Sequence, residues 1–286
     1  MMRFFLILAA TLALGTPASA EPPVWIVRDV DSEMLIFGSV HVLPPDLAWR
    51  PAALDAAVAE ADDLWFELPV GPAAEREVTD IAARTGVLGS GKSLLQMLPK
   101  RDASRLLRVA DIYGVNLGSL DRLEPWLAEL VLAGSAYART GADAQHGVEH
   151  VIDAAAPAAA VRVALETPAE QMALFDETPL KDQLASLRQS LRDLERDPKQ
   201  YVELLEAWRN GDMDRLNAEA VESLRKASPT MFRRLVTERN SRWTDRIDAR
   251  LKGYGRTVVV VGVGHLIGKG GVPARLRALG YSVTGP

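Results

Sequence analysis

The chain has no cysteine, few aromatic residues and only four histidines. Without cysteine it cannot form disulfides, thiolate metal sites, a cysteine nucleophile or a lipid-modified cysteine behind an export signal. No apolar run reaches the ~20 residues that cross a bilayer. The 33 lysines and arginines alternate with 38 acidic residues rather than forming a basic stripe. We therefore expect no nucleic-acid partner and no stable membrane span once the export signal described next is removed.

The first twenty residues have the composition of an export signal. Arg3 gives a weak positive start, residues 4–14 are apolar, and Ala18-Ser19-Ala20 is a small-residue cleavage site. We expect cleavage after Ala20 and export to the periplasm or the medium. Residues 21–286 are then long enough for one large domain with an ordinary apolar core.

The apolar pattern separates short strands from a long helical stretch. Strand-like runs occupy residues 24–27, 34–37, 64–68, 161–165, 257–261 and 281–284. Helical patterns cover residues 47–61, about 75–251 and 274–279. The sequence predicts an α/β (α+β) fold, with a small mixed central sheet built from N- and C-terminal strands and a large helical insertion at about 75–251. Leucines from Leu180 to Leu194 have a heptad-like spacing and predict a helical arm, packed within the chain or on a partner.

Two copies of a short phrase follow strand-like runs at opposite ends of the domain: Gly38-Ser39-Val40-His41 and Gly262-Val263-Gly264-His265. Two acids are associated with similar runs, Glu67 inside an apolar run and Glu166 just behind another. Buried polar groups are costly unless they are partnered. Two histidines and a glutamate, with one further carboxylate, are a plausible shell for a divalent metal that keeps an open position for water. The alternative is a set of hydrogen-bonded structural side chains.

Two other spellings fit known motifs but lie in the wrong context. Residues 86–93 end in Gly91-Lys92-Ser93 and match a phosphate-binding P-loop, yet a helical pattern precedes them where a P-loop needs a strand. The segment 146–150 spells the His-x-x-Glu-His of some zinc peptidases. Gly147 is better suited to begin a helix over 148–155, so we interpret His146 and His150 as surface residues.

Further phrases give the chain a resemblance to the TraB/PrgY/GumN group, which is related to the Tiki proteases. The resemblance covers nearly all of residues 21–286, and the order and spacing of the phrases agree. Besides the two phrases that end in histidine, it rests on residues 65–68, 125–127, 165–167 with Gln171, 238–240 with Trp243, and 280–283. Where the family tends to have Gly-hydrophobic-Asp, this chain has Gly147-Val148-Glu149. The glutamate side chain is one methylene longer than that of aspartate.

The resemblance implies metal-dependent hydrolysis of a peptide or protein, with manganese or cobalt favoured and zinc possible. His41, Glu67 and His265 would bind the ion, which would acidify a water and polarise the scissile carbonyl. Glu166 would be the base or a further ligand. Arg239 and Asn240 would donate to the developing oxyanion. Related folds include a metal-independent esterase type that uses histidine and glutamate, and a haem- or iron-binding type. A non-enzymatic protein that sequesters peptides is the third alternative.

Overall fold

The computed structural model describes residues 21–286, so the predicted export signal lies outside the described residues. Six strands form one mixed sheet in the order β4-β3-β5-β2-β1-β6. The four strands β4, β3, β5 and β2 run parallel, while β1 is antiparallel to both β2 and β6. The strands are β1 (Val24–Arg28), β2 (Ser32–Ser39), β3 (Asp63–Phe66), β4 (Val161–Ala164), β5 (Gly255–Gly262) and β6 (Ser282–Thr284). The predicted mixed sheet, in which early and late strands pair, is confirmed.

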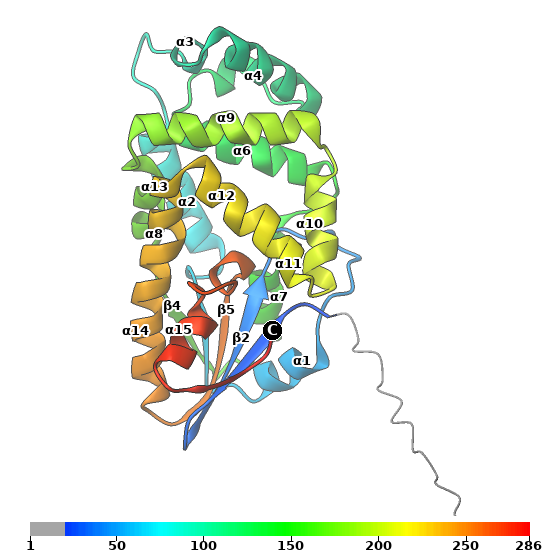
Figure 1. Cartoon of the computed structure of the whole chain (residues 1–286), viewed down its shortest axis with the longest axis vertical. Coiled ribbons are helices and arrows are strands. Elements are labelled where there is room, and N and C mark those ends of the chain that lie inside the picture. Colours follow the sequence, from blue (N-terminus) through cyan, green and yellow to red (C-terminus); the bar gives the residue numbers. More distant parts are fainter. Residues whose placement is uncertain (1–20) are drawn as a thin grey trace, which may run out of the picture.

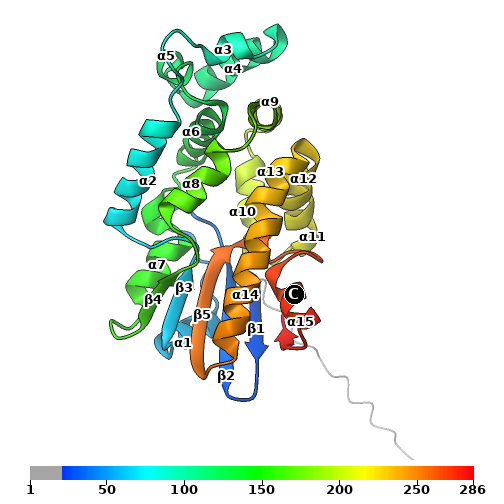
Figure 2. The ribbon, with the colours of Figure 1, turned by 90° about the vertical axis from the view of Figure 1, so that its left-hand side faces the viewer.

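The sheet is covered on both faces, and this explains the unbroken apolar run in β5. Phe37, Val258 and Val260 pack into a core with α1 (Ala52–Ala59), α7 (Val148–Ala155) and α10 (Gln200–Arg209). The residues that alternate with them, such as Val259 and Val261, pack against α14 (Arg239–Leu251) and α15 (Val272–Ala278). Parallel strands buried on both faces are expected to be apolar throughout. Figure 2 shows α1 and α7 on one side of the sheet and α14 and α15 on the other.

Most of the remaining helices form a layer beyond the carboxyl ends of the parallel strands (Figure 1). Buried residues of α4, α6 and α9 make a third apolar cluster there. Leu187 and Leu191 of α9 are fully buried in this cluster, so the predicted helical arm packs within the chain. The elements between β3 and α14, apart from those already given, are α2 (Pro72–Thr85), α3 (Leu94–Met97), α4 (Lys100–Tyr113), α5 (Leu117–Leu120), α6 (Pro125–Ala138), α8 (Pro168–Asp176), α9 (Leu180–Arg196), α11 (Met213–Leu216), α12 (Ser223–Ala227) and α13 (Pro229–Phe232), with a 3₁₀ turn η1 (Ala144–His146) and two π-helical turns, η2 (Asn217–Glu222) and η3 (Arg233–Glu238).

One helix boundary differs from the prediction, and the context of the P-loop spelling is now visible. The helix expected over 47–61 begins only at Ala52, because Pro51 disfavours helical geometry at the residue before it and stands at the N-cap itself. The P-loop spelling at 86–93 connects α2 to α3, without the strand that a phosphate-binding loop requires. Among residues 21–286, no helix combines the length and the apolar character needed to cross a membrane.

Candidate functional site

The four parallel strands bring the predicted site residues to one edge of the sheet. His41 lies two residues beyond β2, Glu67 directly follows β3, and Glu166 lies two residues beyond β4. His265 ends a short 3₁₀ turn, η4 (Val263–His265), that follows β5. The carboxyl ends of parallel strands share an edge and are the usual place for a ligand site in such sheets. The grouping that the sequence suggested is therefore present in the fold.

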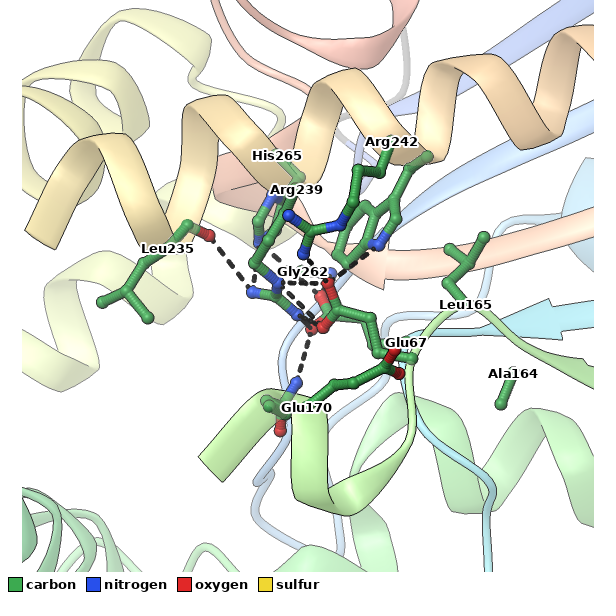
Figure 3. Close-up of polar contacts among 12 residues, drawn as sticks. Glu67, Ala164, Leu165, Glu170, Leu235, Arg239, Arg242, Gly262 and His265 are labelled. Carbon is green, nitrogen blue, oxygen red and sulfur yellow. Dashed lines mark hydrogen bonds and ion pairs between the residues drawn. The ribbon is translucent and has the colours of Figure 1, made fainter. Parts of the chain in front are cut away.

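Arg239, the first residue of α14, lies at the centre of this edge. Its Nη2 is 2.6 Å from Glu67 Oε2, and its Nε is 3.0 Å from both carboxylate oxygens of Glu166. All three side chains are more than nine-tenths buried. Figure 3 shows the guanidinium between Glu67 and His265. Burial alone would raise the pKa of Glu67, but Arg239, with the His265 and His41 rings and the Gly262 amide, holds it well below its usual range.

Four of the five N–H groups of this guanidinium make hydrogen bonds. They donate to the two carboxylates, to the Leu235 carbonyl at 3.2 Å and to His265 Nε2 at 3.0 Å. The fifth N–H is on Nη2, which lies 2.9 Å from Glu166 Oε2 in the buried ion pair. The guanidinium is thus committed to Glu67 and Glu166, and the predicted donor role does not suit Arg239. Its geometry instead holds Glu67 in place.

The hydrogen bonds of Asn240 fix the tautomer of His265. The Asn240 Nδ2 group donates to the carbonyls of His265 and Gly270 at 3.1 and 2.9 Å, so its Oδ1 must accept. His265 Nδ1 lies 2.6 Å from that oxygen and therefore carries the proton. The lone pair on His265 Nε2 then accepts from Arg239. Burial lowers the pKa of His265 to about 3, which keeps the ring neutral. Asn240, fully buried and fully bonded, has no donor for an oxyanion either.

Glu166 is held just as completely. Besides Arg239, its Oε1 accepts from Trp243 Nε1 at 3.1 Å and from Arg242 Nη2 at 3.2 Å. Both oxygens of Glu166 face these donors, and no atom of Glu166 is among those nearest to Gly262, where Glu67 and His41 meet, so Glu166 is not placed to serve as the base there. The contacts place Glu166 against Arg239, in an arrangement that suits neither of the roles that we expected, the base or a further metal ligand.

The three predicted metal ligands do not fit a common ion in this arrangement. The His265 lone pair and one oxygen of Glu67 are both taken by Arg239. His265 also presents its Cδ2 carbon, not a nitrogen, toward the space above Gly262. Among residues 21–286 no three or more histidine, aspartate or glutamate side chains are grouped so that they could hold an ion.

Of the three predicted metal ligands, His41 is the accessible one, with a side chain that is 63% exposed. Its Nδ1 is 2.8 Å from Glu149 Oε1, and Ser39 Oγ donates to the same oxygen at 2.6 Å. Glu149 raises the pKa of His41 to about 9, so the ring carries a proton on each nitrogen at neutral pH. A carboxylate on Nδ1 also fixes the orientation of the imidazole, with Nε2 left for chemistry.

Glu149 contacts His41, and the sequence did not reveal this contact. The phrase Gly147-Val148-Glu149 pointed to it, but the segment alone could not show that α7 packs on the strand-end loop of His41. The neighbouring histidines lie apart, because His146 pairs with Asp143 and His150 with Glu75, at 2.7 and 2.8 Å. The interpretation of His146 and His150 as surface residues is supported by these contacts.

Gly262 has no side chain, and this leaves a space beside Glu67 Oε1 and His41 Nε2, the two groups of the site that Arg239 does not contact. A methyl group built on its Cα would lie 3.1 Å from Glu67 Oε1 and 3.6 Å from His41 Nε2. The Gly262 amide itself donates to Glu67 Oε1 at 2.7 Å, which fixes that oxygen. A Cβ is only a bond length from Cα, so a water must lie beyond this position; we give the name Gly262 space to the region beyond it that faces Glu67 Oε1 and His41 Nε2. It is the place in the site where one small atom can meet a carboxylate oxygen and an imidazole nitrogen together.

A substitution at Gly147 tests the packing that brings Glu149 to His41. A Cβ on Gly147 would lie 2.0 Å from the His41 carbonyl oxygen, so Gly147→Ala must push α7 away from this loop. We expect the free energy of unfolding, measured with urea, to fall by about 1–3 kcal/mol. Gly134→Ala in α6 is the matched control: the added Cβ meets nothing within 4 Å, and stability should rise by up to ~1 kcal/mol. Equal effects of the two changes would show that the close approach is absent.

Comparison with known proteins finds a matching family model and relatives of low identity. The model of the "TraB/PrgY/gumN family" matches residues 23–285. A relative with the name "Uncharacterized protein YbaP" from Escherichia coli (strain K12) is 23% identical over 243 residues, which cover 85% of this chain and 87% of that protein. The protein of the same name from Shigella flexneri matches to the same extent. No solved structure matches the chain.

Proposed function

The chain belongs to the TraB/PrgY/gumN family, and we propose that it is an exported hydrolase that cleaves acyl bonds, with a peptide or protein as its substrate. The observation that carries the proposal is the Gly262 space, bounded by Glu67 Oε1 and His41 Nε2. The pKa of Glu67 is lowered and that of His41 is raised to about 9. Neighbouring groups whose pKa values are pushed apart are suited to act as base and acid. The composition of residues 1–20 supports export to the periplasm or the medium.

The proposed reaction places the attacking water in the Gly262 space. Glu67 Oε1 accepts the proton of this water as its oxygen bonds to the carbonyl carbon of the substrate. His41 Nε2 donates its proton to the leaving nitrogen or oxygen as the bond to the carbonyl carbon breaks. The products are a carboxylic acid and an amine or alcohol, and the proton on Glu67 returns to His41 through solvent. Glu149 stabilises the protonated ring before it donates.

The buried residues around this pair supply its fixed geometry. Arg239 holds one oxygen of Glu67 and leaves the other facing the Gly262 space. Glu166 and His265 in turn hold Arg239. Such a network needs no movement when the reaction begins, and fixed polar groups in a buried site contribute strongly to catalysis.

The proposal predicts a specific dependence on pH. Because His41 must be protonated to donate, kcat/KM for a peptide should be constant near neutral pH and fall as pH rises through about 9. His41→Gln should lower kcat/KM by about 10²–10⁴-fold and remove the alkaline decline. The substrate is found first with a peptide library and a set of acyl esters, with cleavage followed by mass spectrometry.

The control for this experiment is His150→Gln, which removes an imidazole bonded to Glu75 on the surface. It should leave both rate and pH profile unchanged. An alkaline decline that survives in His41→Gln would assign the titrating group elsewhere. Tight binding of library peptides without cleavage, in wild type and His41→Gln alike, would replace the hydrolase by a protein that sequesters peptides.

A further inference from the structure

The proposed active site needs a hydrogen-bond donor for the carbonyl oxygen of the substrate, which becomes negative as water adds to the carbonyl carbon. The two residues that the sequence suggested for this role are committed elsewhere. The guanidinium of Arg239 is bound to Glu67 and Glu166, and the amide of Asn240 donates to two backbone carbonyls. The donor is therefore expected from another residue beside Glu67.

Gln171 is a second side chain that donates to Glu67. Its Nε2 lies 3.3 Å from Glu67 Oε2, the oxygen that also accepts from Arg239 at 2.6 Å. The other oxygen, Oε1, accepts from the Gly262 amide and faces the Gly262 space. Because both oxygens are bonded to one carbon, the Gln171 amide lies close to the atom that accepts the proton of the attacking water in the proposed reaction.

The start of α8 fixes the position of Gln171. Thr167 is the N-cap of this helix: its side chain accepts from the Glu170 amide at 3.2 Å, and Glu170 Oε2 accepts from the Thr167 amide at 2.8 Å. Such a reciprocal pair satisfies two N–H groups that a helix start leaves free. The Gln171 amide follows and donates to the Thr167 carbonyl at 3.1 Å. The side chain is thus presented from a regular helix and not from a loop, as a precise contact requires.

The side-chain amide of Gln171 has a second N–H that the described residues do not use. A glutamine amide carries two N–H groups and one acceptor oxygen, and since an ionised carboxylate only accepts, Nε2 is the atom that faces Glu67. Within residues 21–286 this contact is the one hydrogen bond of the side chain. Gln171 is half-buried, and its Oε1 is not among the enclosed polar atoms that lack a partner, so this end of the amide reaches solvent. A substrate that lies over Glu67 can therefore meet the second N–H.

We propose that Gln171 is a further catalytic residue, whose second Nε2–H donates to the carbonyl oxygen of the substrate as that oxygen becomes negative. The inference rests on the proposed hydrolysis by Glu67 and His41. When the water oxygen bonds to the carbonyl carbon, one electron pair of the C=O bond moves to the oxygen, where Gln171 stabilises it. The pair returns when the leaving group departs with the proton of His41. Gln171 keeps both of its protons throughout, and its first N–H stays on Glu67 Oε2.

The first test compares Gln171→Met with wild type in kcat and KM for a peptide that the wild type cleaves. We expect kcat to fall by about 10²–10³-fold, because a donor to the oxyanion is lost. KM should change by less than about threefold, because the contact forms in the transition state and not with the bound substrate. The decline of kcat/KM above pH 9 should remain, because His41 is untouched. Gln96→Met is the matched control, an exposed glutamine of α3, and it should behave like wild type.

A phosphonate analogue of the cleaved peptide separates donation to the oxyanion from mere support of Glu67. Its charged tetrahedral group imitates the transition state, so Gln171→Met should weaken its binding by about the factor lost in kcat/KM. Gln171→Ala is a second variant without the amide and should show the same loss, with urea unfolding as the check of folding. Unchanged kcat, or equal binding of the phosphonate by wild type and both variants, would overturn the role of Gln171 alone. Absence of cleavage in the wild type would overturn the proposed hydrolysis, and this role with it.

Discussion

Replacement of Arg239 by methionine is expected to lower the free energy of unfolding by about 3–5 kcal/mol, the usual cost of removing one partner from a buried ion pair. Glu67 and Glu166 would then remain as two buried carboxylates whose shared cation is gone. Their charges would repel, and three of their hydrogen bonds would be unmade. The change is measured by urea unfolding at neutral pH.

The matched control is Arg242→Met on the same helix. Arg242 also contacts Glu166, at 3.2 Å, but its side chain is 53% exposed. Exposed pairs contribute about 0–1 kcal/mol, so this variant should lose little. Adding Glu67→Gln and Glu166→Gln to Arg239→Met should restore part of the stability, because the uncompensated charges are then gone. If Arg239→Met and Arg242→Met lose the same small amount, Arg239 is not the centre of a buried network.

Gly262→Ala is expected to abolish most activity while the protein stays folded. The new methyl would lie 3.1 Å from Glu67 Oε1 and 3.6 Å from His41 Nε2, so it would project into the Gly262 space and displace the proposed water. Gly262 has φ −50° and ψ 131°, which alanine adopts without strain. Misplacing the attacking water costs about 10²-fold or more in kcat/KM. The measurement is peptide cleavage beside urea unfolding.

Gly264→Ala is the control, two residues further along the same turn. A methyl at Gly264 meets nothing within 4 Å, so activity and stability should stay near those of wild type. Retained activity in Gly262→Ala would mean that the water lies elsewhere, and the assignment of Glu67 and His41 as its neighbours would be wrong.

The sequence predicted the sheet and the convergence of the site for one physical reason. His41, Glu166 and His265 follow apolar runs and Glu67 lies within one, and the ends of parallel strands meet at one edge. Side-chain orientation could not be predicted in the same way. The guanidinium of Arg239 makes hydrogen bonds within the site through four of its five N–H groups, which depends on the packing of α14 across the sheet and not on any local spacing.

Glu149 illustrates the other limit. The residue stands 108 positions from His41, on a helix that reaches it only because Gly147 lets α7 approach the His41 carbonyl. The local sequence showed Gly147 and Glu149 but not that both lie against His41. The predicted metal set failed the geometric test for a related reason: the right residue types meet, but their lone pairs face Arg239 and not one another.

The most direct test of the acid–base site is kcat/KM for a cleaved peptide after the protein has been unfolded and refolded in a strong chelator. The account predicts the same value before chelation, after it, and after titration with manganese, cobalt or zinc, together with loss of activity in His41→Gln at every stage. Activity that disappears on chelation and returns with one of these ions would contradict it, and would place a metal among His41, Glu67 and His265 after a movement of Arg239.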